Sequence, residues 1–193
     1  NPNLLFVGTD RGVYVSFTGG KKWLPFNNNM PKAPARDLLV HPREKDLVVG
    51  TYGRGAFVTD ISPLQELTEE VLEKDAYLFK IEPKPQLNYS QRRFWGNFEL
   101  LGDRPLTTPN EPNGLAIYYY FKKDSDQKAL LEIYNCFGQK VKTFEIDHER
   151  GLHRIYWDTA KAQPGIYKVV LKTGTEVLTR FARVTPRWTW PVK

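Results

Sequence analysis

Two segments of the chain carry the same residue pattern, 42 positions apart. Residues 1–9 (NPNLLFVGT) return as residues 41–51 (HPREKDLVVGT) with a short insert, and 11–16 (RGVYVS) align with 54–59 (RGAFVT). Alternating apolar residues and the recurring Gly-Thr pair predict short strands joined by tight turns. A period of about 40 to 45 residues filled with strands is the length of one four-stranded propeller blade. One such unit cannot bury its faces alone, so the repeat predicts stacked β units.

The run SFTGGKKW, from Ser16 to Trp23, follows the first repeat. It resembles the Asp-box of sialidase-like and sortilin-like propellers, which is written Ser-x-Asp-x-Gly-x-Thr-Trp. Ser16, Gly20 and Trp23 match that pattern, whereas Thr18 stands at the Asp position and Lys22 at the Thr position. In that family the box is a structural hairpin, so the resemblance implies a fold and no catalytic residue.

The second repeat and its continuation, residues 41–67, are similar to the last-blade segment of large bacterial BNR-repeat proteins of the sortilin-like type, many of them labelled glycosyl hydrolases. A propeller needs at least four blades. We therefore expect residues 1–61 to be the terminal blade segment of a larger propeller, whose other blades belong to the same parent protein or to another chain. The resemblance implies a secreted, periplasmic or cell-surface protein of a Gram-negative bacterium, with Bacteroidetes as one candidate group.

Residues 62–113 are predicted to be a short helix followed by a proline-rich linker. Ser62 is a candidate N-cap with Pro63 at the first helical position, and residues 77–79 are predicted to form a short strand. Five prolines between residues 82 and 113 are typical of a loop or linker.

Residues 114–185 are predicted to form an immunoglobulin-like β-sandwich, because apolar alternation recurs between closely spaced turn signals. Trp157 is the expected core tryptophan, and Pro164-Gly165 fits the centre of a type II turn. Tyr167 and the alternate residues after it should face the core. The predicted strands lie near residues 115–122, 129–135, 140–146, 152–158, 165–173 and 176–184.

Three runs in this region, residues 131–141 (LEIYNCFGQKV), 151–158 (GLHRIYWD) and 164–171 (PGIYKVVL), resemble the flagellar-hook-capping (FlgD-type) Ig-like domain. The same pattern is similar to the C-terminal sorting domains of type IX secretion cargo. A sorting domain normally stops close to its last strand, whereas here a tail, residues 186–193, runs on.

The net charge of +6 raises the question of an anionic partner, but the basic residues are scattered. We expect a solvated basic surface and no nucleic-acid partner. The single cysteine, Cys136, excludes an intramolecular disulfide, and no apolar run is long enough for a transmembrane helix.

No catalytic residue can be named from the sequence, which lacks nucleotide-binding, serine-nucleophile and zinc-spaced cysteine motifs. Asp147, His148, Glu149 and His153 are of metal-ligand type, but their position in a hairpin turn favours a solvated loop. We expect no metal and no cofactor.

Phe94, Trp95, Trp188 and Trp190 are aromatic residues outside the predicted strands. Two interpretations of them remain open: they hold the linker and tail onto the domains, or they stack on a sugar or a partner protein. The tyrosines Tyr118–Tyr120 raise a similar question, since one face of their strand should be core and the other an interface. The residues proposed for ligand or interface contact are Arg54, Arg92, Arg93, Phe94, Trp95, Trp188 and Trp190.

The sequence therefore predicts an all-β chain, with two partial propeller blades followed by an Ig-like sandwich, that serves as a non-catalytic structural or interaction module. It would brace the last blade of a propeller protein and present a protein- or glycan-binding surface. The alternative is the accessory C-terminal region of a glycoside hydrolase whose active site lies in upstream blades, where a pair of carboxylates would be required.

Overall fold

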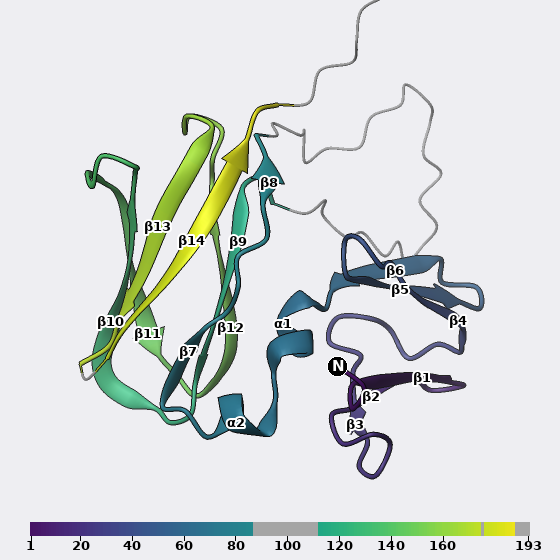
Figure 1. Cartoon of the computed structure of the whole chain (residues 1–193). Helices are drawn as coiled ribbons and strands as arrows, with labels where there is room; N and C mark the ends of the chain where they lie inside the picture. Colours follow the sequence, from purple (N-terminus) through teal and green to yellow (C-terminus); the bar gives the residue numbers. More distant parts are fainter. Residues whose placement is uncertain (87–111, 175, 188–193) are drawn as a thin grey trace, which may run out of the picture. The chain divides into compact units, whose positions relative to one another are not determined.

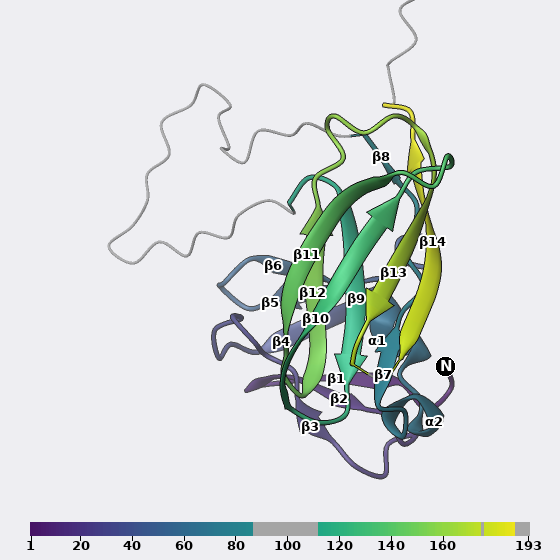
Figure 2. The ribbon, with the colours of Figure 1, turned by 90° about the vertical axis from the view of Figure 1, so that its left-hand side faces the viewer.

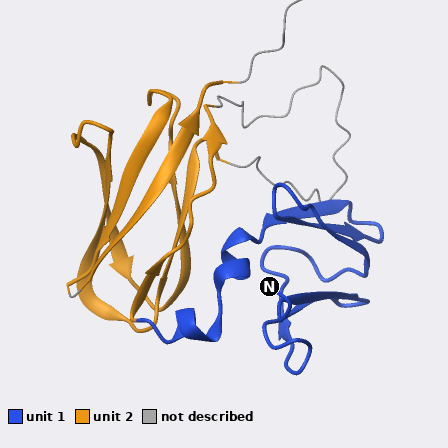
Figure 3. Cartoon of the chain, viewed as in Figure 1, with its two compact units in different colours: residues 1–74 blue, residues 75–193 orange. Residues whose placement is uncertain are grey.

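The computed structural model describes residues 1–86, 112–174 and 176–187, and the chain divides into two compact units, residues 1–74 and 75–193 (Figure 3). The chain is mostly β: of the residues that the structure describes, 52% lie in strands and 6% in helices. The predicted β-rich class is therefore confirmed.

The first unit contains two three-stranded antiparallel sheets, each a meander in which neighbouring strands follow one another in the chain (Figure 1). The paired registers place Phe6 opposite Val15 in one sheet, and Leu38, Val49 and Phe57 in one cross-strand row of the other. The first sheet holds β1 (Leu5–Thr9), β2 (Gly12–Ser16) and β3 (Leu24–Pro25), and the second holds β4 (Ala35–Val40), β5 (Asp46–Thr51) and β6 (Ala56–Asp60).

One apolar cluster joins these two sheets. Side chains at alternate strand positions point into it, as the period of a strand requires. Its buried members are Leu4, Val13, Val15, Leu47, Val49, Ile61 and Leu64, and partly buried residues such as Phe6, Leu38 and Phe57 pack against them.

Two short helices, α1 (Ser62–Glu66) and α2 (Glu69–Leu72), follow β6. The predicted helix is confirmed, but its N-cap is Ile61 and not Ser62. The Asp60 carboxylate accepts a hydrogen bond from the Ser62 backbone N–H at 2.7 Å, so the acidic side chain satisfies a donor at the start of the helix.

The second unit consists of two sheets around a shared core (Figures 1 and 2). The curled five-stranded sheet has the order β11-β10-β13-β14-β8, and the three-stranded sheet has the order β12-β9-β7. All pairs are antiparallel except β8 with β14. The strands are β7 (Ala76–Leu78), β8 (Lys84–Pro85), β9 (Leu115–Phe121), β10 (Ser125–Tyr134), β11 (Lys140–His148), β12 (Gly151–Trp157), β13 (Gly165–Lys172) and β14 (Val177–Thr185).

All six strands predicted after residue 114 are present, and their ends differ from the predicted ones by no more than four residues. The short strand predicted near residue 77 is present as β7, which pairs with β9. β8 was not predicted, because two residues in a proline-rich stretch are too few to show the alternation of apolar and polar residues that marks a strand. Its parallel pairing with Val184 and Thr185 adds it to the edge of the five-stranded sheet.

Trp157 lies in the core of the second unit, as predicted, and meets the Tyr167 ring edge-on at 4.8 Å between centroids. Tyr167, Val169 and Leu171 also point into this core. The prediction of a type II turn centred on Pro164-Gly165 was wrong, because Gly165 begins β13 and does not adopt the positive φ that such a turn needs.

Tyr118, Tyr119 and Tyr120 are all buried. Of the three, Tyr119 belongs to the core cluster of the second unit. The expectation that one face of this strand is core is therefore confirmed at Tyr119.

Candidate functional site

Of the residues proposed from the sequence for binding, Arg54 lies in the described part of the chain. It is exposed in the turn between β5 and β6, flanked by Gly53 and Gly55, both at positive φ. Nearby, the Arg36 guanidinium stacks over the Tyr52 ring at 5.5 Å. Arg92, Arg93, Phe94, Trp95, Trp188 and Trp190 lie outside the described residues.

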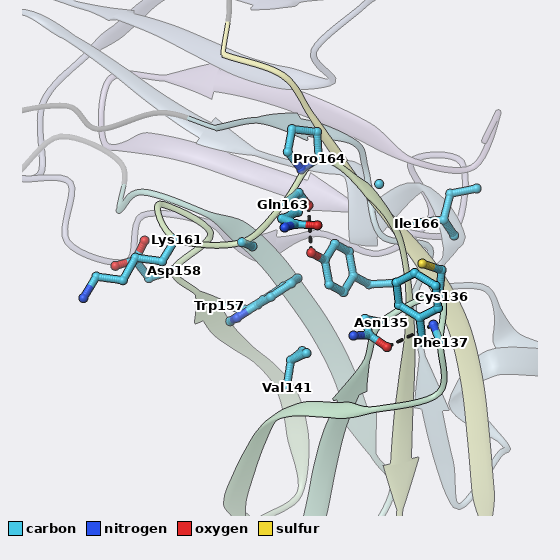
Figure 4. A pocket seen from close by; sticks show the side chains of 13 residues that line it. Asn135, Cys136, Phe137, Val141, Trp157, Asp158, Lys161, Gln163, Pro164 and Ile166 are labelled. Carbon is cyan, nitrogen blue, oxygen red and sulfur yellow. Dashed lines mark hydrogen bonds between the residues drawn. The ribbon is translucent and has the colours of Figure 1, made fainter.

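A pocket of about 340 Å³ opens at one end of the second unit (Figure 4). This volume is within the range of small-molecule sites. Two connections form its walls: the turn between β10 and β11, and the loop between β12 and β13. The lining residues are Asn135, Cys136, Phe137, Val141, Trp157, Asp158, Lys161, Ala162, Gln163, Pro164, Gly165, Ile166 and Tyr167.

The β10–β11 turn is held in shape by Asn135. Its side-chain oxygen accepts hydrogen bonds from the backbone N–H groups of Phe137 at 3.0 Å and Gln139 at 2.9 Å. Gly138 completes the turn at a positive φ of 76°, which a side chain would disfavour. The turn therefore fixes the backbone at Phe137, whose side chain is 82% exposed.

The opposite wall, the β12–β13 loop, is held by several hydrogen bonds. The Asp158 carboxylate accepts from the Ala160 N–H at 2.9 Å. The Tyr167 hydroxyl donates to the Gln163 carbonyl at 2.7 Å, one of the dashed lines in Figure 4. The side-chain amide of Gln86, just after β8, donates to the carbonyls of Thr159 and Ala162. Strand β8 thus helps to fix the loop.

Two charged side chains line one side of the pocket, and two large exposed apolar side chains line the other. In Figure 4, Asp158 and Lys161 lie on one side of Trp157, and Phe137 and Ile166 lie on the other. Trp157 is largely buried, whereas Ile166 is 59% exposed. Such a mixture suits a ligand that has an apolar face and polar edges.

The first unit carries apolar side chains on the outward faces of both its sheets. On β1, Leu5 and Val7 are about two-fifths exposed. On the other sheet, Leu39, Val48 and Val58 form one cross-strand row, and Leu39 and Val58 are mostly exposed. Exposed apolar rows of this kind are typical of interaction surfaces.

The Asp-box-like run forms the turn between β2 and β3. The buried Ser16 hydroxyl accepts hydrogen bonds from the N–H groups of Thr18 at 3.2 Å and Gly20 at 2.9 Å. The Thr18 hydroxyl accepts from the Lys22 N–H at 3.0 Å. Thr18 therefore supplies an acceptor at the position where the motif has Asp, and the run is a structural turn.

Glu132 forms a charged network on β10. Its carboxylate lies 2.6 Å from Lys172 Nζ and 3.1 Å from Lys140 Nζ, and it accepts a hydrogen bond from the Tyr134 hydroxyl at 2.7 Å. The bond from Lys172, and then those from Tyr134 and Lys140, lower the pKa of Glu132 to about 2. Both carboxylate oxygens of Glu132 have partners within the protein, which fits a structural role for Glu132.

The two histidines considered as metal ligands pack on aromatic rings. His148 lies 3.9 Å from the Phe121 ring centroid, and His153 stacks on Tyr119 at 5.4 Å. Burial raises the pKa of Tyr119, and the charges of Asp147 and Glu149 add to this effect. Across residues 1–86, 112–174 and 176–187, no three His, Cys, Asp or Glu side chains gather as a metal site.

No protein-family model matches the chain, and a search of curated proteins returned no match. Within the described ranges, no helix has the length and apolarity needed to span a bilayer.

The sequence reasoning did not find the pocket. Its residues lie in four separate predicted strands and in the connections between them, and the pairing of β10 with β13 brings the start of β13 beside the β10–β11 turn. Phe137 was a usable signal in the sequence, since a large aromatic side chain between two predicted strands raises the question of what it contacts.

Proposed function

We propose that this chain is a non-catalytic structural and interaction module, the C-terminal region of a secreted or cell-envelope BNR-repeat propeller protein. In this proposal the first unit supplies terminal blade segments, and the second unit is an Ig-like, FlgD-type domain that braces the last blade and presents a binding surface. The partners of the first unit are further blades with the same repeat.

The observation that carries the proposal is how the two repeats contact each other. The first repeat buries Val13 and Val15, whose equivalents in the second repeat, Ala56 and Val58, are exposed. The second repeat buries Leu47 and Val49. Their equivalents in the first repeat are Leu5 and Val7, which are about two-fifths exposed.

Each repeat therefore uses a different face for the contact. A head-to-tail contact of this kind leaves one unsatisfied face at each end of the stack, and further copies of the unit can add there. Addition of units around a closed rotation gives a ring, which is the architecture of a propeller. Covering an apolar face such as that of Leu39, Val48 and Val58 with another unit lowers the free energy, because it removes apolar surface from water.

The test is self-association of the chain in analytical ultracentrifugation, because its two exposed faces should bind each other head to tail. We expect concentration-dependent assemblies. Val58→Lys should block one face and Leu5→Lys the other, so each variant alone should be monomeric. An equimolar mixture of the two should form dimers, because each variant retains the face that the other lacks.

Phe181→Lys is the matched control, since Phe181 is a similarly exposed apolar residue on β14 of the second unit. It should associate like the unmodified chain. Monomers at all concentrations, or a mixture of the two blocked variants that fails to pair, would contradict the proposal.

A further inference from the structure

We propose that the pocket of the second unit binds one uncharged sugar ring, such as a hexose unit of a glycan. This inference deepens the proposed function and rests on it, because it names the site and the ligand class of the binding surface. Its three supports are a preformed shape, exposed apolar side chains with no other evident use, and a polar side of zero net charge.

The shape of the pocket is set by the protein's own hydrogen bonds. Asn135 fixes the turn that carries Phe137, and Tyr167, Asp158 and Gln86 fix the opposite loop. A ligand would therefore pay little free energy for ordering these walls. The volume of about 340 Å³ suits one ring-sized group rather than a folded segment.

The apolar side of the pocket exposes side-chain surface that a ligand could cover. Phe137 and Ile166 are exposed beside the largely buried Trp157. Water against such surface is unfavourable by about 25 cal/mol for each Å². A sugar ring presents an apolar face of C–H groups, which can lie against aromatic and aliphatic side chains.

The polar side of the pocket determines the charge of the ligand. Asp158 and Lys161 carry opposite charges, so the site does not favour an ion of either sign. The Asn135 side chain is used within its own turn. Asp158 uses one carboxylate oxygen for Ala160 and can accept a hydrogen bond from a ligand with the other.

Lys161 makes no hydrogen bond or ion pair within the described part of the chain, so its ammonium group can donate to a ligand. Hydroxyl groups both donate and accept. A ring with several hydroxyls can therefore hydrogen-bond to both Asp158 and Lys161, whereas a purely aromatic ligand would form a hydrogen bond with neither.

The experiment is a titration of the ¹⁵N-labelled full chain with the methyl glycosides of glucose, galactose, mannose and N-acetylglucosamine, followed by NMR. With at least one of them, we expect the amide signals of Phe137, Lys161 and Ile166 to shift together. The Kd should be on the order of 1 mM, as expected for a single ring. Phe137→Ser and Lys161→Met should each weaken binding about tenfold, and Phe181→Ser, outside the pocket, should bind normally.

Three results would overturn the inference: no pocket signal shifts with any of the four sugars, the Phe137 variant binds as well as the unmodified chain, or indole shifts these signals and the sugars do not. The melting temperature of each variant is measured alongside, so that lost binding is separated from lost folding. The association of the Leu5 and Val58 faces is measured independently, so failure of one proposal is distinguishable from failure of the other.

Discussion

Val15 and Val58 hold the same position in the two repeats of the first unit, yet Val15 is 3% exposed and Val58 is 63% exposed. The chemistry of the two positions is the same, and their strands pair in the same way with the strand before them. What differs is the neighbour: the other sheet covers Val15. In the function proposed above, the exposed valine is where a next unit would pack.

The first prediction compares these two valines. Val15→Ala should lower the free energy of unfolding of the first unit by about 2 kcal/mol, because it removes buried methyl groups and leaves a cavity. Val58→Ala should change it by less than about 0.5 kcal/mol in the monomer, as is usual for a surface position. Urea denaturation at low protein concentration measures both. Equal losses at the two positions would contradict the assignment of the faces.

The second prediction concerns the turn between β2 and β3. Ser16→Ala should destabilise the first unit by about 1–3 kcal/mol, because two backbone N–H groups lose their buried acceptor. Thr18→Asp should raise the melting temperature, since a carboxylate is a stronger acceptor for the Lys22 N–H than a hydroxyl. Thr18→Val, which keeps the shape but has no acceptor, should lower it. Calorimetric melting of the three variants gives the order, and a Thr18→Val variant as stable as the unmodified chain would show that this hydrogen bond is unimportant.

The third prediction concerns pH. The pKa of Glu132 falls from its ordinary value of 4.5 to about 2 in the folded protein. The ionised carboxylate therefore stabilises the fold above pH 4.5, and this contribution is lost as the pH falls from 4.5 toward 2. Glu132→Gln should lower stability at pH 7 by about 1–3 kcal/mol, because it removes charge-assisted hydrogen bonds. The difference in unfolding free energy between the unmodified chain and Glu132→Gln should shrink as the medium is acidified through this range.

Urea denaturation of both proteins in a pH series measures this difference. A difference that stays constant down to pH 2 would be inconsistent with the lowered pKa of Glu132.

The fourth prediction compares two glycines near the pocket. Gly114 has a φ of +109°, and a side-chain carbon there would collide with the backbone of Trp157. Gly114→Ala should therefore prevent the second unit from folding normally or destabilise it by several kcal/mol. Gly165→Ala should be tolerated, because its φ is not positive and the space around it is open. Near-ultraviolet circular dichroism and thermal melting report on Trp157 packing, and a disrupted Gly165→Ala protein would contradict the geometry of the loop.

Most strands of the second unit could be located from sequence because they have a local signal. Alternating apolar residues predicted β13, and Trp157 was placed correctly in the core for the same reason. Local signals failed where the chain has no period, as at β8. They also failed at Pro164-Gly165, where the pair begins a strand instead of forming the centre of a turn.

The sequence by itself determined the positions of most strands, the repeat in the first unit and the alternation that builds each core. The tertiary structure decided which of two equally apolar faces is covered, as at Val15 and Val58, and which turns meet to form the pocket. The physical reason is that strand alternation is a property of consecutive residues, whereas burial depends on what packs against a face. That neighbour can be far away in the chain, as Gln86 is from the pocket loop that it holds.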